Sequence, residues 1–281
     1  MCAYLTKADF FYETAFGRGL LKLIQAAGGF RVAAWFLHTG LSRHLIPGYI
    51  RKNDIDMTPY EGQTYHCFAE FFARERRSTQ FALDTDTLIS PCDGRLTVYP
   101  VSENLTIPMK GSHYHLRDLI PDDGVANVFH DGLCLVFRLE ASDYHHFCGF
   151  DDMMMVETRF VPGLLHSVQP IACQTVPVYR LNRRWWSLLE TVHFGLAAQI
   201  EVGAMVVGDV QFPQKSGWLY RGDEMGHFEL SGSTIVLFLA SDVRRRLHLM
   251  EPFEKTWGGA SEAVVHMGEG IGKLCHEEQN R

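Results

Sequence analysis

The feature that most constrains the fold is a change of sequence texture near residue 83. Beyond it, short runs of β-branched and aromatic residues alternate with Gly, Pro and Asp, and short runs between turn residues favour strands over helices. No regular alternation of strands and helices is visible. The predicted strands are Arg95–Tyr99, Leu133–Leu139, Val156–Val161, Gln199–Val210 and Thr234–Leu239. We therefore predict an α+β fold, in which an N-terminal helical region (residues 1–82) precedes a mainly antiparallel β core domain (residues 83–281).

The N-terminal region contains two apolar helical runs. Leu20–Ala27 is rich in good helix formers, Gly28-Gly29 interrupts it, and Val32–Leu37 follows. Together with the preceding Arg18, Lys22 and Gln25 of this run lie on one helix face, at i, i+4 and i+7. Such helices can lie in a membrane interface or pack on a protein core, and the pattern does not separate the two. A short charged helix is predicted from Phe68 to Arg77.

Charge and cysteine content exclude several classes of protein. The 281 residues carry a net charge of −7, which argues against broad electrostatic binding to nucleic acid. We expect no membrane-spanning helix, because no apolar stretch is long enough, and no secretory signal. Seven cysteines without a CxxC pair argue against a disulfide framework and a structural zinc site, and favour a reducing compartment.

Two short motifs in the predicted β domain carry acid–base chemistry. Pro91-Cys92-Asp93-Gly94 has the pattern of a turn, and a carboxylate held in a turn can orient a histidine. In Asp143–Cys148, the adjacent His145 and His146 should point to opposite faces of a strand. Histidine is the usual acid or base near neutral pH. A metal role has little support from the histidine spacing, so no metal site is predicted.

Two glycine-containing segments follow. Gln199–Gly208 holds glycines inside an apolar run and does not match a nucleotide-binding fingerprint. Ser231-Gly232-Ser233-Thr234 precedes an apolar strand. Because a flexible glycine precedes it, the hydroxyl of Ser233 can attack the preceding carbonyl and form an ester. β-Elimination then cuts the chain, and the new N-terminal dehydroalanine hydrolyses to a pyruvoyl group.

Taken in order, the motifs of this chain resemble those of the phosphatidylserine decarboxylase proenzyme family. The resemblance runs from about residue 53 to the C-terminal strand. Each motif is weak alone, but eight in series make coincidence improbable. They are Pro91-Cys92-Asp93-Gly94, Lys110-Gly111-Ser112, Asp143-Tyr144-His145, Val161-Pro162-Gly163, Asn182-Arg183, Val202-Gly203-Ala204, Gly222-Asp223-Glu224-Met225-Gly226 and Gly232-Ser233-Thr234.

The resemblance implies a carboxy-lyase that matures from a zymogen. Self-cleavage between Gly232 and Ser233 would give a β chain, residues 1–232, and an α chain, residues 233–281, that stay partners. Ser233 would become a covalent pyruvoyl cofactor, the electron sink for decarboxylation. Asp93 corresponds to the acidic member of an Asp/His/Ser self-cleavage triad, and His145 is our choice for the acid that protonates the α-carbon.

One departure from the family pattern concerns the self-cleavage base. Many members read Asp-Tyr-His-Arg-x-His, and the second histidine is the usual base. Here Cys148 takes that position and His146 replaces the arginine, as in a Cys-containing bacterial-type branch. Three alternatives stay open: His145 serves both steps, Cys148 acts as a thiolate if its pKa is lowered, or His166 reaches the site. Ser231 offers a second hydroxyl, but Ser233 better matches the family.

The resemblance also implies a substrate and a location. The expected reaction converts phosphatidylserine to phosphatidylethanolamine in phospholipid biosynthesis, at the cytoplasmic face of the cell membrane, by a peripheral protein that binds the membrane surface. A homodimer is plausible from the family. The Arg183–Trp186 segment could lie near lipid head groups or form a hairpin tip with partly buried aromatics. The alternatives are a soluble pyruvoyl-dependent decarboxylase of a free, for example aromatic, amino acid, and a non-cleaving, non-enzymatic membrane-associated module.

Overall fold

The computed structural model describes residues 7–102, 104, 106–109, 112–204, 209–230 and 233–275. From Lys7 on, the chain forms short helices, as predicted. Thr14 caps the second helix by accepting a hydrogen bond from the backbone N–H of Gly17 at 2.9 Å. Gly28 separates the second and third helices with a φ of +69°, a conformation that favours glycine. The helical elements up to residue 72 are α1 Lys7–Glu13, α2 Ala15–Ala26, α3 Gly29–Leu37, η1 Gly40–Leu45, α4 Ile46–Asn53, η2 Thr58–Tyr60 and α5 Phe68–Phe72.

Helix α5 is shorter than the sequence predicts. The prediction of a helix from Phe68 to Arg77 is wrong beyond Phe72. The side chain of Arg74 is buried, and its Nη2 donates to the carbonyl oxygens of Ser142 at 3.1 Å and Asp143 at 3.3 Å. These tertiary contacts keep Arg74 from continuing the helix. They outweigh the local helix propensity, which is roughly a few tenths of a kcal/mol per residue.

The centre of the molecule is an eight-stranded sheet in which every neighbouring pair is antiparallel. This confirms the α+β fold with a mainly antiparallel β part. In spatial order the strands are β11 Gly217–Leu219, β7 Met153–Val161, β8 Arg184–Thr191, β9 Gly195–Val202, β13 Ser233–Leu239, β5 Leu133–Leu139, β2 Gly94–Pro100 and β15 Ala263–Val265.

Within the described residues, three smaller sheets surround the large one. The predicted strand Gln199–Val210 is divided, because β9 ends at Val202 and β10 joins another sheet. One sheet has the order β10-β12-β6, another β1-β16-β14, and β3 pairs with β4. Their strands are β10 Val210–Gln211, β12 Glu224–Phe228, β6 His146–Cys148, β1 Thr87–Ile89, β16 Gly270–Leu274, β14 Leu247–Leu249, β3 Thr106–Met109 and β4 Ser112–His115.

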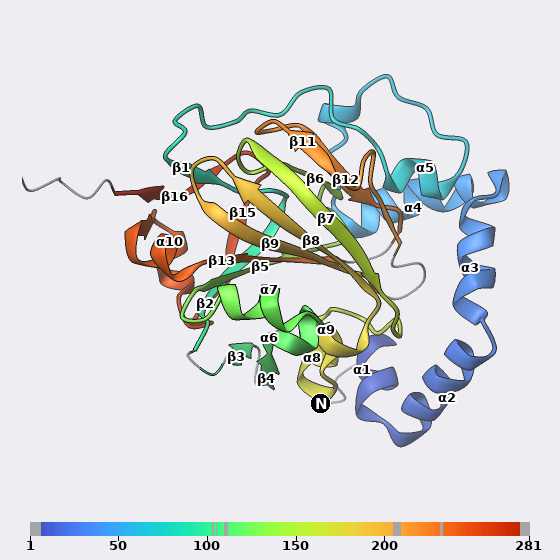
Figure 1. The fold of residues 1–281 in the computed structure, drawn as a ribbon. Helices are drawn as coiled ribbons and strands as arrows, with labels where there is room; N and C mark the ends of the chain where they lie inside the picture. The colour runs from blue at the N-terminus through green and yellow to red at the C-terminus, as the bar shows by residue number, and fades with distance from the viewer. Residues whose placement is uncertain are drawn as a thin grey trace, which may run out of the picture.

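Strand β13 shows how the layers are arranged. Ile235 and Leu237 pack in one cluster with Phe147 of β6 and Phe228 of β12, so this face of the large sheet meets the β10-β12-β6 sheet. Val236 packs on the other face, where the helices α6–α9 lie (Figure 1). Because side chains alternate along a strand, Ser233 shares the face of Ile235. The remaining helices are α6 Leu116–Leu119, α7 Asp123–Val128, α8 Pro170–Thr175, α9 Val178–Leu181, α10 Ser241–Arg246 and η3 Phe253–Thr256.

Helices α2 and α3 form one rim of the molecule (Figure 1). Gln25 at the end of α2 donates from its Nε2 to the carbonyl oxygen of Leu165 at 3.2 Å, and α3 has no buried residue. Within the described residues, no single helix is long and apolar enough to cross a membrane. Ala15–Gln25 and Gly29–Leu37, bent by 68° at their break, satisfy length and composition only as a pair.

Candidate active site at the start of strand β13

Ser233, the predicted nucleophile, is the first residue of β13 and is 1% exposed. It lies opposite Leu139 of β5 in the strand register. The other half of the predicted scissile bond, Gly232, and the second hydroxyl, Ser231, lie outside the described residues. The predicted nucleophile is therefore placed in the protein interior at the start of a strand, away from bulk water.

Asp93 lies on the other side of the same residue of β5. Arg95 of β2 pairs with Arg138, so Gly94 comes beside Leu139. A Cβ on Gly94 would lie 2.8 Å from the carbonyl oxygen of Arg138, and its φ is +148°, so the predicted turn needs glycine here. Neighbouring strands lie about 4.8 Å apart, which places the backbones beside Asp93 and Ser233 roughly 10 Å from each other.

The carboxylate of Asp93 joins three segments. It forms an ion pair with the guanidinium of Arg76, whose Nη1 lies 3.0 Å from Oδ1. The backbone N–H of Met267 donates to Oδ1 at 2.9 Å, and that of Tyr144 donates to Oδ2 at 3.4 Å. Among the described residues these donors, rather than a histidine ring, are its hydrogen-bond partners. Asp93 therefore acts on the neighbouring His145 through its charge and through the backbone of Tyr144.

His145 is fully buried, with its ring 4.2 Å from that of Phe72 between centroids. Its Nδ1 lies 3.0 Å from the carbonyl oxygen of Asp143, so Nδ1 carries the proton. Its Nε2 has no hydrogen-bond partner in the described chain. Burial, with a smaller effect of Arg74, lowers the pKa of His145 to about 3. The imidazole is neutral at neutral pH, and its Nε2 lone pair can accept a proton.

Cys148, at the position of the usual base, is buried in β6. Burial raises the pKa of its thiol to about 12, and the nearby Arg221 only partly opposes this effect. At neutral pH the side chain is a thiol, so the structure does not favour its use as a thiolate base.

His166 lies on the helix-covered side of the sheet. The Asn182 side chain accepts from its backbone N–H at 2.8 Å and donates to its carbonyl oxygen at 2.8 Å. The same amide donates to the carbonyl oxygen of Gly203 at 2.7 Å. The His166 ring lies 6.0 Å from that of Tyr12, which packs in the cluster on that face. Asp93, His145 and Cys148 are therefore gathered on adjoining segments, whereas His166 is separated from the Ser233 side chain by the sheet.

Glu201 of β9 was missed by the sequence analysis. It is fully buried and lies opposite Ile235 of β13, one diagonal step from Ser233 on the same face. The Nε2 of Gln199 donates to its Oε1 at 2.9 Å, and its Oε2 has no hydrogen-bond partner among the described residues. Burial raises the pKa of Glu201 to about 8, so the group is mostly a neutral carboxylic acid. A glutamate in an apolar run was the available signal.

Arg76 was also missed, because its charged run was interpreted only as part of a short charged helix. Its guanidinium lies 4.5 Å from the centre of the Tyr144 ring. Tyr144 stacks on His146 at 4.6 Å, and His146 stacks on His227 at 4.6 Å. We call Arg76, Tyr144, His146 and His227 the stacked column. It borders a hollow of about 190 Å³ lined by Phe81, Tyr144, His146, Cys148, Glu224 and Met267, among others.

The Arg183–Trp186 segment does not form an exposed tip. Arg184 is 5% exposed, and its guanidinium donates to the backbone carbonyls of Leu119 at 3.0 Å and Arg180 at 3.0 Å. Trp186 is 1% exposed. The hypothesis that this segment meets lipid head groups is therefore wrong for Arg184 and Trp186, since β8 carries them into the interior.

Comparison with known proteins identifies the family. A family model described as phosphatidylserine decarboxylase matches residues 65–273. Phosphatidylserine decarboxylase proenzyme 2 of Clostridium acetobutylicum is 35% identical over 267 residues, covering 94% of this chain and 90% of that protein. Phosphatidylserine decarboxylase proenzyme of Clostridium kluyveri is 35% identical over 272 residues, covering 93% and 90%. The chain belongs to the phosphatidylserine decarboxylase family.

Proposed function

We propose that this protein decarboxylates phosphatidylserine to phosphatidylethanolamine after cutting itself between Gly232 and Ser233. The observation that carries the proposal is the placement of Ser233, buried at the start of β13 and one strand away from Asp93. The relatives named above bear the name of this activity in its proenzyme form. No observation on this chain favours a free amino acid as substrate or a non-enzymatic module.

Self-cleavage needs a base that can accept a proton in a site from which water is excluded. A base takes the Ser233 Oγ proton, and Oγ bonds to the Gly232 carbonyl carbon. The Gly232–Ser233 amide bond then breaks, and the Ser233 nitrogen gains a proton. A base next removes the Ser233 Cα proton, the Cβ–O bond breaks, and Gly232 leaves as a carboxylate. Tautomerisation and water then release ammonia and leave the pyruvoyl group.

We assign the base role to His145, whose Nε2 is unpartnered among the described residues and whose ring is neutral. Its assignment as the later acid at the α-carbon requires that it first gains a proton. Glu201, protonated through burial and on the same face as Ser233, can donate one to a developing oxyanion. Asp93 stabilises positive charge on His145, because the negative carboxylate raises the histidine pKa against the effect of burial.

The buried end of β13 fits the covalent pyruvoyl group proposed for Ser233. The group supplies an electron sink for the carbanion formed when CO₂ departs. Water exclusion comes from the packing around Ser233. The Nε2 of His145 and the Oε2 of Glu201, which have no hydrogen-bond partner among the described residues, are available to polar atoms of a bound substrate. The two cut chains should stay together, since β13 pairs with β5 on one side and β9 on the other.

We propose that α2 and α3 attach the protein to the membrane surface, on its cytoplasmic side. Phe16, Leu23, Val32 and Trp35 are between 64% and 75% exposed. Arg18, Lys22 and Arg31 are exposed on the same two helices. Exposed apolar side chains beside basic ones are typical of helices that lie in a lipid interface, and a phospholipid substrate is reached there.

Denaturing intact mass of the purified protein tests the proposal first. We expect two species split after Gly232, the smaller blocked by a pyruvoyl group, in the wild type and in Ser231→Ala. Ser233→Ala should remain one chain without activity, and a cut, active Ser233→Ala protein would overturn the assignment. Product analysis with phosphatidylserine vesicles and with free amino acids then identifies the substrate. Native mass of the purified protein shows whether it forms the homodimer that the family resemblance makes plausible.

A further inference from the structure

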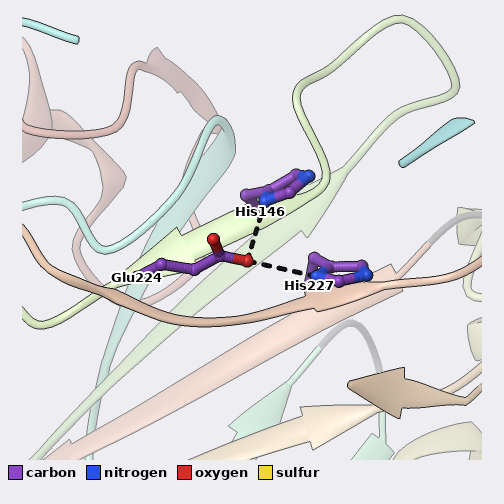
Figure 2. Close-up of side chains that lie close together, drawn as sticks. All are labelled: His146, Glu224 and His227. Atoms are coloured by element: carbon purple, nitrogen blue, oxygen red, sulfur yellow. Dashed lines mark hydrogen bonds and ion pairs between the residues drawn. The ribbon is translucent and has the colours of Figure 1, made fainter. Parts of the chain in front are cut away.

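A cluster of two histidines and one glutamate, to which the proposed reaction gives no role, lies at one end of the stacked column. The Nδ1 atoms of His146 and His227 lie 3.0 Å and 3.1 Å from the same carboxylate oxygen, Oε1 of Glu224 (Figure 2). The three ligand atoms all lie within 4.8 Å of one another. We propose that His146, Glu224 and His227 form a binding site for a zinc-class divalent metal ion, a site that the decarboxylation proposed above does not require.

The strand pairing explains why these three side chains converge. His146 of β6 and His227 of β12 are directly opposite each other in an antiparallel pair. The register shifts between Glu224 and Gly226, so a bulge turns the Glu224 side chain to the face of the two histidines. Bulges of this kind often re-aim a side chain at a functional position. The cluster is therefore built by the backbone of two paired strands.

The second nitrogen of His146 supports a cation at Nδ1. Its Nε2 lies 3.1 Å from the carbonyl oxygen of Ala73, which can only accept a hydrogen bond, so Nε2 carries a proton. In the neutral ring, Nδ1 then directs a lone pair at the Glu224 carboxylate 3.0 Å away. Two acceptors at that distance repel each other unless a cation lies between them. Metal-binding histidines typically donate their other N–H to a carbonyl or carboxylate in this way.

The donor set and the two spacings between nitrogen and oxygen suit a tetrahedral metal ion. Zinc commonly takes two histidines and one carboxylate, and leaves a fourth position open. With ligands at about 2.0–2.1 Å, a tetrahedral ion holds its ligand atoms roughly 3.3 Å apart, close to the two distances between nitrogen and oxygen found here. Two neutral imidazoles and one carboxylate also balance half of the ion's charge.

The site is open to entering ions. The Glu224 and His227 side chains are 41% and 25% exposed, whereas that of His146 is 4% exposed. Glu224 and His146 line the hollow beside Cys148, and His227 lines a second hollow with Ala73. A bound ion would tie β6 to β12. It would thereby steady the strand that follows His145.

Metal titration of the tag-free, full-length protein tests the site. After chelator treatment, Zn²⁺ is titrated by calorimetry, and Co²⁺ by the visible absorption of a tetrahedral complex. We expect one equivalent to bind. His227→Gln should weaken binding by more than about 100-fold, since even a residue that only orients a ligand costs 10- to 100-fold. His248→Gln is the matched control, because His248 is exposed on β14, outside the cluster.

Several outcomes would overturn the proposal. They are a wild type that binds no stoichiometric Zn²⁺ or Co²⁺, a His227→Gln protein that binds like the wild type, and a His248→Gln protein that loses binding equally. In the first case, ¹⁵N NMR of the imidazoles should show both ring nitrogens of His146 protonated, which identifies a proton as the cation. Circular dichroism establishes that each variant is folded. The result is independent of self-cleavage and decarboxylation, because the probe is the metal alone.

Discussion

The two adjacent histidines of the Tyr144–Cys148 segment lie on its two sides, His145 in an apolar setting and His146 in a polar one. His145 packs against Phe72 and leaves Nε2 without a partner among the described residues. His146 is almost as buried, yet both its ring nitrogens face oxygen atoms, of Glu224 and of Ala73. Burial alone thus does not decide what a histidine can do. An apolar setting leaves a proton acceptor free for chemistry, and a polar one holds the ring in place.

The sharpest test of this contrast replaces each histidine in turn. His145→Asn should lower self-cleavage or decarboxylation by roughly 10²- to 10⁴-fold, because it removes the positioned acid–base group. His146→Asn removes a ring that is held by Glu224 and Ala73 and has no role in the proposed reaction, so it should cost less. Rates of chain cutting, followed by intact mass, and of CO₂ release separate the two steps. Equal losses of rate in His145→Asn and His146→Asn would show that the two histidines do not differ in their importance for the reaction.

Asp93 connects the two sides, since it pairs with Arg76 of the stacked column. Asp93→Asn leaves the Arg76 guanidinium without its countercharge in a largely buried position. We expect a loss of about 3 kcal/mol in the free energy of unfolding, the lower end for breaking a buried pair. Urea denaturation in a Ser233→Ala background, which keeps one chain, measures it. Asp93→Asn combined with Arg76→Met should recover part of the loss, and a purely additive double variant would show that the pair is not coupled.

Glu201 is a second ionisable group in an apolar setting, and it should make the free energy of unfolding depend on pH. Its folded pKa of about 8 lies above the ordinary value of 4.5, so between these values the folded chain holds a proton that the unfolded chain has lost. The free energy of unfolding should therefore fall by about 1.4 kcal/mol per pH unit as pH rises through this window. Glu201→Gln in the Ser233→Ala background should remove this contribution, measured by urea denaturation from pH 5 to 8 with Ser233→Ala alone as reference. If the free energy of unfolding changes with pH equally in both proteins, the raised pKa of Glu201 is contradicted.

The smallest effect on stability is expected where apolar groups face water. Trp35 of α3 is 69% exposed, so Trp35→Ser should change the free energy of unfolding by less than about 0.5 kcal/mol. Its binding to phosphatidylserine vesicles should nevertheless weaken clearly, by about 10-fold if roughly 1.4 kcal/mol of burial in lipid is lost. Vesicle flotation measures the change. Trp218→Ser, on β11 and 44% exposed, is the control and should float like the wild type.

Local patterns predicted the scaffold better than the site. The Asp93-Gly94 turn and the start of β13 were predictable, because turn residues and β-branched runs act over a few positions. The ion pair of Asp93 with Arg76 was not, since a charged run is normally solvated and its partner lies 17 residues away. The setting of Glu201 depends on three strands that meet only in the folded sheet, and Glu224 reaches the histidines through a bulge. The periodicity of the sequence therefore predicts neither arrangement.

The central position of β13 has a consequence for how the protein can refold. Before cutting, this strand enters the sheet as part of one chain, and folding is unimolecular. After the proposed cut between Gly232 and Ser233, the same strand must be captured between β5 and β9 of a separate chain, so recovery from unfolding becomes a second-order process that depends on protein concentration. The mature enzyme's lifetime then rests on how slowly it unfolds rather than on how readily it refolds.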